Sequence, residues 1–230
     1  MTLNVVTRAL RRLSALSFAL CAMPVVLADQ GPTDKTTELS GQPRSVIAIV
    51  PMFHQLLRFS YPLGFRAVFE SARGDTYTQE SVRTGETLDH WTEMITVSGA
   101  RGLSADQNVT PQKFMERMAS GFRSECPNSF RALDLGAARF GRFDAFEAVL
   151  SCGELSRRGT LSSESTLVIS IKGERDYYTI QWAERGAPSR SAVNVKPAIW
   201  FDRLKRLSPI RLCPIVPGEP PPYVSCMRTE

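Results

Sequence analysis

Two neighbouring segments, 166–172 and 177–182, constrain the fold of this 230-residue chain most strongly. Both are dense in β-branched and aromatic residues, the types that favour strands. Four residues that begin with Gly173 separate them, and a short connection of this kind between two such segments is typical of a β-hairpin. We therefore predict an antiparallel sheet that contains this hairpin.

Further strands are expected on both sides of the hairpin. The fold is expected to begin at 45–51 and to continue through the apolar stretch 55–61. Residues 65–71 alternate apolar and polar positions with a period of two, which indicates a half-buried strand. Strand patterns then follow at 76–82, 94–97 and 143–152. Residues 98–109 are expected to be a loop, and the Ser- and Gly-rich segment 153–165, with Arg157 and Arg158 at its centre, a long exposed hairpin loop.

Two helices interrupt the strands. Thr110 and Pro111 form a helix start, because the hydroxyl can cap free backbone N–H groups and proline tolerates the first helical position. Apolar residues recur at helical spacing from Phe114 to Phe122, and Pro127 predicts the end of the helix near Cys126. A second helix is predicted over 197–207. The fold class is therefore α+β, an antiparallel sheet packed by about two helices in a sandwich-like arrangement.

The first 28 residues have the layout of a secretory signal peptide. A basic start that ends at Arg12 precedes an apolar run, and the small residue Ala28 stands before the acidic Asp29. An uncleaved membrane anchor is the alternative, but the apolar run is shorter than the roughly 20 residues that span a bilayer. We expect a periplasmic or secreted protein with no stable membrane span after cleavage.

The net charge does not indicate a nucleic-acid partner. The whole chain has a formal charge of +5, but without the three leader arginines 25 of the 28 basic residues remain against 23 acidic ones, a net charge of +2. No run of Lys and Arg interleaved with aromatic residues remains to follow a phosphate backbone.

Outside the leader the chain has four cysteines, Cys126, Cys152, Cys213 and Cys226. An even number in an exported chain predicts two disulfides. Three pairings are open, and we favour Cys126–Cys152 with Cys213–Cys226 because each closes a local segment. A zinc site is the alternative, but no two of these cysteines have the two- to four-residue spacing of typical zinc ligands.

The organisation predicted outside the leader has three parts. Residues 29–44 are polar and turn-forming and are expected to be a flexible lead-in. Residues 45–207 are expected to form a single α+β domain. Residues 208–230 hold six of the 15 prolines. This tail is predicted to be neither helix nor inner strand and to be tied to the domain by the Cys213–Cys226 bridge.

A resemblance supports this organisation. The segment from Gly85 to Met94, followed by the helix at Pro111, the strand 178–182 and a closing helix, resembles exported bacterial proteins of uncharacterised function. More distantly, the pattern is similar to the Mog1/PsbP-like fold. Proteins of that fold are mostly small accessory or binding domains without catalytic machinery, so the resemblance implies a role without catalysis.

Candidate functional residues gather in the segment 77–97. It holds Glu80, Glu86 and His90 beside Trp91, which we expect to anchor a glycine turn to the core. His90 and Glu93 have the spacing of neighbours on a helix, but this pair alone does not make a metal or catalytic site. The chain contains no Gly-x-Ser-x-Gly elbow, phosphate-binding glycine loop or His-Glu-x-x-His helix. We therefore assign no catalytic residue, metal ligand or cofactor.

Two functions remain open. The first is an exported accessory or binding protein for an unknown protein or small-molecule ligand, with a contact surface formed by Glu80, Glu86, His90, Arg157 and Arg158. The second is a secreted hydrolase of unrecognised type that uses Glu80, Glu86 or His90.

Overall fold

A computed structural model describes residues 45–157 and 159–228. The predicted signal peptide and lead-in therefore lie outside the described residues, as does Arg158.

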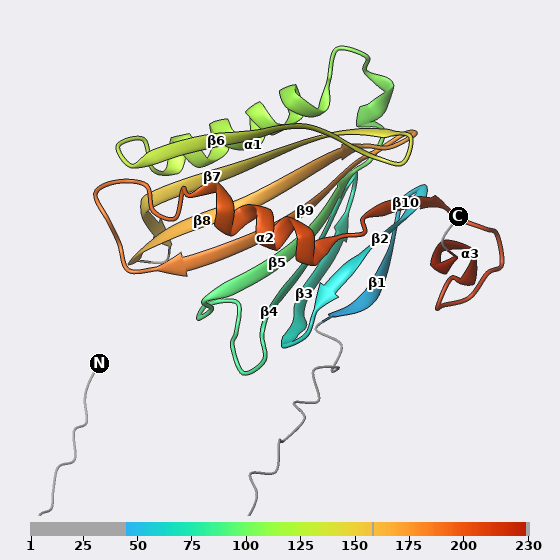
Figure 1. Cartoon of the computed structure of the whole chain (residues 1–230), viewed down its shortest axis with the longest axis horizontal. Coiled ribbons are helices and arrows are strands. Elements are labelled where there is room, and N and C mark those ends of the chain that lie inside the picture. The colour runs from blue at the N-terminus through green and yellow to red at the C-terminus, as the bar shows by residue number, and fades with distance from the viewer. Residues whose placement is uncertain (1–44, 158, 229–230) are drawn as a thin grey trace, which may run out of the picture. The chain divides into compact units, whose positions relative to one another are not determined.

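The described chain forms two antiparallel sheets and three α-helices, so the predicted α+β class is confirmed (Figure 1). The larger sheet has the strand order β3-β4-β5-β9-β8-β7-β6, and the smaller has the order β1-β2-β10. The strands are β1 (Ser45–Met52), β2 (Gln55–Pro62), β3 (Phe65–Arg73), β4 (Thr76–Arg83), β5 (Glu93–Ala100), β6 (Phe130–Phe140), β7 (Phe143–Arg157), β8 (Thr160–Lys172), β9 (Tyr177–Gly186) and β10 (Arg211–Pro214). The helices are α1 (Pro111–Glu125), α2 (Pro197–Leu207) and α3 (Val224–Met227), with a 3-10 turn, η1 (Leu103–Ala105).

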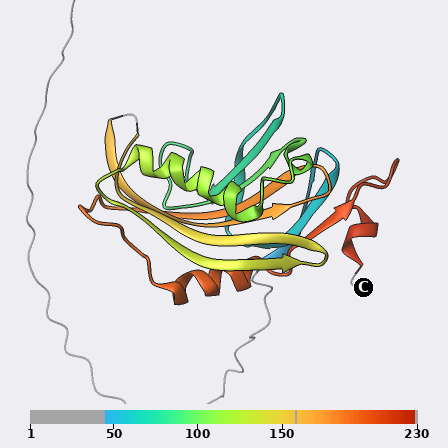
Figure 2. The same ribbon diagram turned by 90° about the horizontal axis from the view of Figure 1, so that it is seen from above.

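The two longer helices cover opposite faces of the seven-stranded sheet, as Figure 2 shows. The α1 helix begins as predicted, with the Thr110 hydroxyl accepting a hydrogen bond from the Lys113 N–H and Pro111 in the first turn. Its buried side chains, Met115 and Ala119, pack on the apolar cluster of β7 and β8. The helix therefore covers only the part of this sheet face that β6, β7 and β8 form.

The main core lies on the other face. There α2 and the three-stranded sheet pack against the larger sheet through buried side chains from both sheets and the helix. The largest are Trp182, Trp200, Tyr178 and Phe59. The hairpin β8–β9, predicted from the sequence, contributes the centre of this core, since Ile169 and Ile180 pair in register and are fully buried. The sandwich-like arrangement is confirmed.

Both favoured disulfides are present. Cys126 and Cys152 join the end of α1 to β7, with 5.8 Å between their Cα atoms. Cys213 and Cys226 join β10 to α3, with 5.7 Å between their Cα atoms. Each bridge closes a segment that is local in the sequence.

The predicted loop 153–165 is wrong, because β7 and β8 continue through most of it. Its serines are strand residues, and the hydroxyl group of Ser165 finds its partners inside the protein. Ser151 and Ser165 share a hydrogen bond of 2.8 Å, and the Ser165 hydroxyl also donates to the Val193 carbonyl oxygen at 2.6 Å. The serine-rich composition therefore reflects polar contacts between β7, β8 and the segment that contains Val193.

Three smaller expectations also fail. The loop predicted over 98–109 begins later, because β5 continues to Ala100. The tail contains the short helix α3, although β10 lies at the edge of its sheet as expected. The strand over 65–71 is not half-buried, because β3 is an edge strand whose register shifts between Ala67 and Phe69 and which leaves Phe69 exposed.

The strand β6 is not predicted from the sequence. This strand lies at the other edge of the seven-stranded sheet and contains no Val, Ile or Thr. Gly136 within it has a φ of +118°, and the register with β7 shifts beside it. The strand therefore lacks the composition that identifies strands in a sequence.

Candidate functional site

The face of the large sheet that carries α1 is only partly covered. The helix packs on β6, β7 and β8, which leaves β4, β5 and β9 with a row of polar side chains. Glu80 pairs with Thr96 and Thr96 pairs with Gln181, so these three residues lie side by side across the strands. Within the described residues, none of the three side chains has a hydrogen-bond partner. We name Glu80, Thr96 and Gln181 the polar row.

The carboxyl group of Glu80 is partly withdrawn from water. Burial raises its pKa, the positive charge of Arg157 lowers it, and the negative charge of Glu164 raises it, with a net upward shift. A carboxyl group of this kind binds a proton more readily than an exposed one and can then donate a hydrogen bond. The structure thus brings two predicted residues, Glu80 and Arg157, within electrostatic reach of each other.

A charged cluster adjoins the row near the tip of the β7–β8 hairpin. The buried Glu164 carboxylate lies 3.4 Å from the Arg185 guanidinium and 3.9 Å from that of Arg157. Arg185 in turn stacks on Trp91, with 3.8 Å between its guanidinium carbon and the ring centroid. Trp91 is buried against Val82 and its neighbours, which confirms that it anchors the turn to the core.

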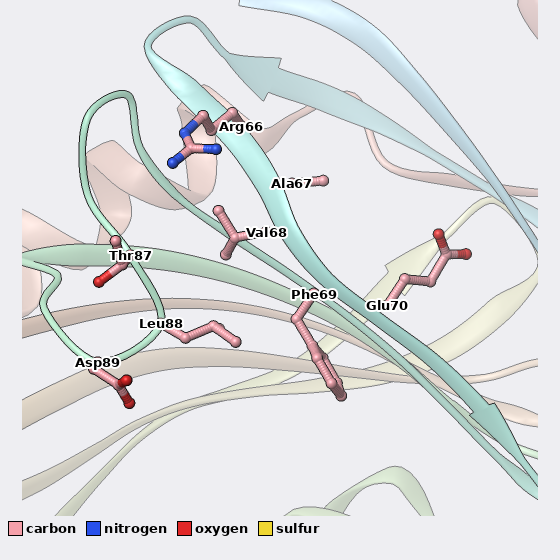
Figure 3. A pocket seen from close by; sticks show the side chains of 8 residues that line it. All are labelled: Arg66, Ala67, Val68, Phe69, Glu70, Thr87, Leu88 and Asp89. Atoms are coloured by element: carbon pink, nitrogen blue, oxygen red, sulfur yellow. The ribbon is translucent and has the colours of Figure 1, made fainter.

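A hollow of about 630 Å³ lies beside the polar row, between β3 and the loop that joins β4 to β5 (Figure 3). Figure 3 shows Leu88 of the loop extending toward Phe69 of β3, and both side chains are exposed. The Arg66 guanidinium holds the loop through a 3.0 Å hydrogen bond to the Glu86 carbonyl oxygen. We name this hollow the β3 hollow. Phe69, which lines it, is the register partner of Glu80, so the hollow adjoins one end of the row.

Glu86 and His90 stabilise the conformation of this loop through hydrogen bonds. The Glu86 carboxylate accepts hydrogen bonds from the Thr92 N–H at 3.0 Å and from the Thr92 hydroxyl at 2.6 Å. Burial acts to raise the pKa of Glu86, but the hydrogen bonds from Thr92 and nearby backbone groups outweigh it and lower the pKa. His90 is exposed and bonds to Thr87 through its backbone. Glu93 begins β5, so His90 and Glu93 do not share a helix.

A second polar site, around Asp176, was not found from the sequence. The Asp176 carboxylate is fully buried and accepts hydrogen bonds from His54 Nδ1 at 2.8 Å, the Tyr178 hydroxyl at 3.0 Å and the Gly102 N–H at 2.8 Å. Burial acts to raise the pKa of Asp176, but these donors outweigh it and lower the pKa. His54 and Asp176 are 122 positions apart, so no local pattern links them.

Among the described residues, the Asp176 site has no third member of a catalytic triad. The His54 side chain is 42% exposed, and its bonded Nδ1 leaves Nε2 as the second ring nitrogen. Over the residues that the structure describes, no serine, threonine or cysteine side chain hydrogen-bonds to this ring. The site joins the β1–β2 turn, the end of β5 and the β8–β9 turn, which makes it a structural junction.

Residues 45–157 and 159–228 contain no cluster of three or more His, Cys, Asp or Glu side chains arranged to bind a metal ion. No helix in this part of the chain has the length and apolar character to cross a membrane.

The sequence matches no protein-family model and no curated protein. The solved structures that are similar in part include the following two. One is LpqN, involved in cell envelope biogenesis of Mycobacterium tuberculosis, with 17% identity, a TM-score of 0.42, and coverage of 73% of this chain and 92% of LpqN. The other is a crystal structure from Bacteroides thetaiotaomicron, with 12% identity, a TM-score of 0.34, and coverage of 71% of this chain and 46% of that one.

Similarities at this level assign no role to the chain. They also do not show the Mog1/PsbP-like fold, which stays a prediction.

Proposed function

We propose that this chain is an exported, non-catalytic binding protein whose ligand contacts the polar row and the β3 hollow. Export is supported by the leader-like first 28 residues and by the two disulfides, because disulfides persist in oxidising compartments outside the cytosol.

The polar row carries the proposal for binding. Glu80, Thr96 and Gln181 offer a carboxyl, a hydroxyl and an amide on three adjacent strands, with no hydrogen-bond partner among the described residues. Neighbouring strands are about 4.8 Å apart, so a ligand across them meets polar groups at regular intervals. Exposed Phe69 adds an apolar surface at one end of the row. This combination suits a small, uncharged ligand with several hydroxyl or amide groups and one apolar side.

A titration with defined compounds tests this function. We would measure binding of N-acetylglucosamine, its oligomers and a set of neutral dipeptides by calorimetry. Substitution of Glu80→Gln or Thr96→Ala should weaken binding about fivefold each, because one hydrogen bond contributes about 1 kcal/mol. The matched control is Glu154→Gln, an exposed carboxylate on β7. Equal losses in the control, or no binding of any of these compounds, would count against the proposed surface.

The hydrolase alternative stays a prediction with its own test. Glu86 is engaged by Thr92, and His90 lies in the loop away from any hydroxyl partner of its ring among the described residues. If any substrate is turned over, the pair Glu86→Ala and His90→Ala should abolish the activity. Full activity in this double variant would remove both residues from the mechanism.

A further inference from the structure

The last part of the described chain forms a covalently closed loop. The Cys213–Cys226 disulfide closes residues 213–226, and we name this ring together with Met227, the last residue of α3, the cystine loop. Figures 1 and 2 both show this segment projecting beyond the strands of the two sheets. Its base is fixed to the fold, since Leu212 and Cys213 of β10 pair with Leu57 and Leu56 of β2.

Hydrogen bonds hold the interior of the loop in one conformation. The Glu219 carboxylate accepts from the Ser225 N–H at 2.8 Å and from the Ser225 hydroxyl at 2.5 Å. The Tyr223 N–H donates to the Pro220 carbonyl oxygen at 3.1 Å. Together with the disulfide and the prolines, these contacts leave little conformational freedom to lose when the loop binds another surface.

The loop exposes an unusual number of large apolar side chains. Exposure reaches 41% for Ile215, 43% for Val216, 49% for Val224 and 45% for Met227. Single exposed apolar residues are ordinary, but a group of them on one projecting element marks a contact surface. The side chains come from both arms of the loop, since the first two follow β10 and the last two belong to α3.

Cations flank both ends of the loop. Arg211 begins β10, and Arg228 follows α3 directly. The Arg211 guanidinium donates to the Arg228 carbonyl oxygen at 3.0 Å, so the two ends lie together at the base. The one carboxylate inside the loop, Glu219, accepts two hydrogen bonds from Ser225, which lower its pKa and keep it ionised. The two arginines therefore outnumber a single negative charge within the loop.

We propose that the cystine loop binds the surface of an anionic lipid bilayer. Its apolar side chains would enter the boundary between headgroups and acyl chains, and Arg211 and Arg228 would face the lipid phosphates. Apolar side chains next to cations are the combination by which peripheral proteins bind such surfaces. A projecting loop also reaches a flat surface more easily than it fills a concave partner. The inference does not depend on the ligand proposed for the polar row.

Vesicle sedimentation tests the proposal. The exported protein, purified after removal of its leader, is mixed with phosphatidylcholine vesicles that contain or lack phosphatidylglycerol. We expect binding to the anionic vesicles. The double substitution Ile215→Ser and Val224→Ser should weaken it at least roughly tenfold, because each buried methylene group contributes about 0.8 kcal/mol. Arg228→Gln should weaken binding to anionic vesicles about fivefold and leave neutral vesicles unaffected.

The matched control is Leu161→Ser, which removes an exposed apolar side chain from the β7–β8 hairpin. This variant should bind like the original protein. Failure of the original protein to sediment with anionic vesicles at low salt would overturn the proposal, as would equal losses in the control. A dimer in sedimentation velocity that the loop substitutions dissociate, without any vesicle binding, would also overturn it and assign the loop to contact with a second copy.

Discussion

The Asp176 junction gives the sharpest test of how this fold is held together. Asp176→Asn keeps one acceptor oxygen, which can still accept from the Gly102 N–H. The new NH₂ group replaces the oxygen that accepts from His54 Nδ1 and the Tyr178 hydroxyl. A hydrogen bond to a charged group contributes about 1.5–3 kcal/mol, and removal of a buried charge offsets part of the loss. We expect the free energy of unfolding to fall by about 2–4 kcal/mol, or the Tm by about 4–16 °C.

The pH dependence identifies the carboxylate as the cause. Because folding lowers the pKa of Asp176, the carboxylate stabilises the protein above its unfolded pKa of about 3.9, and this contribution is lost as the pH falls through the folded value. Urea denaturation at pH 7 should therefore separate the variant from the original protein, and the separation should shrink toward pH 2. Asp202→Asn, at an exposed position on α2, is the control. A loss below about 0.5 kcal/mol, or one that is the same at both pH values, would refute the reasoning.

Three further predictions concern the disulfide, the tryptophan and the loop. Replacement of both Cys126 and Cys152 by Ala should lower the free energy of unfolding by about 3 kcal/mol in urea, and unchanged stability would contradict a closed bridge. Trp91→Ala should cost about 3–5 kcal/mol in the same assay, because it empties a buried site; a cost under 1 kcal/mol would mean that the turn is anchored elsewhere. Glu86→Gln should speed hydrogen exchange of the Thr92 amide, and exchange at the original rate would show that the carboxylate does not hold it.

The sequence predicts those parts of the fold whose signals are local. The β8–β9 hairpin and α1 follow from composition, spacing and a proline at a helix start, and all three are visible within about ten residues. The serine-rich segment 153–165 misleads because the group that accepts from the Ser165 hydroxyl, the Val193 carbonyl, comes from a distant segment. The edge strand β6 is held by its pairing with β7, which no local propensity reports.

In the candidate site, too, the sequence predicts what is local and does not predict contacts between distant segments. The sequence predicts Glu80 and Arg157 as members of one surface, but their neighbours Thr96 and Gln181 join it only because β5 and β9 are adjacent in the sheet. The Asp176 junction forms only where the β1–β2 turn, the end of β5 and the β8–β9 turn meet, and these are far apart in the sequence. Polar sites assembled across a sheet become visible only when the strand order is known.

The pattern of the two disulfides bears on how the chain is oxidised. Each cysteine is joined to the next one along the described chain, and neither bridge encloses a cysteine of the other. In the export proposed above, the chain would cross a membrane from its amino terminus and present Cys126 and Cys152 to the oxidant before Cys213 had emerged. Among these four cysteines, the first partner available to each thiol would then be the native one, and the correct pairs would form in the order in which the cysteines emerge.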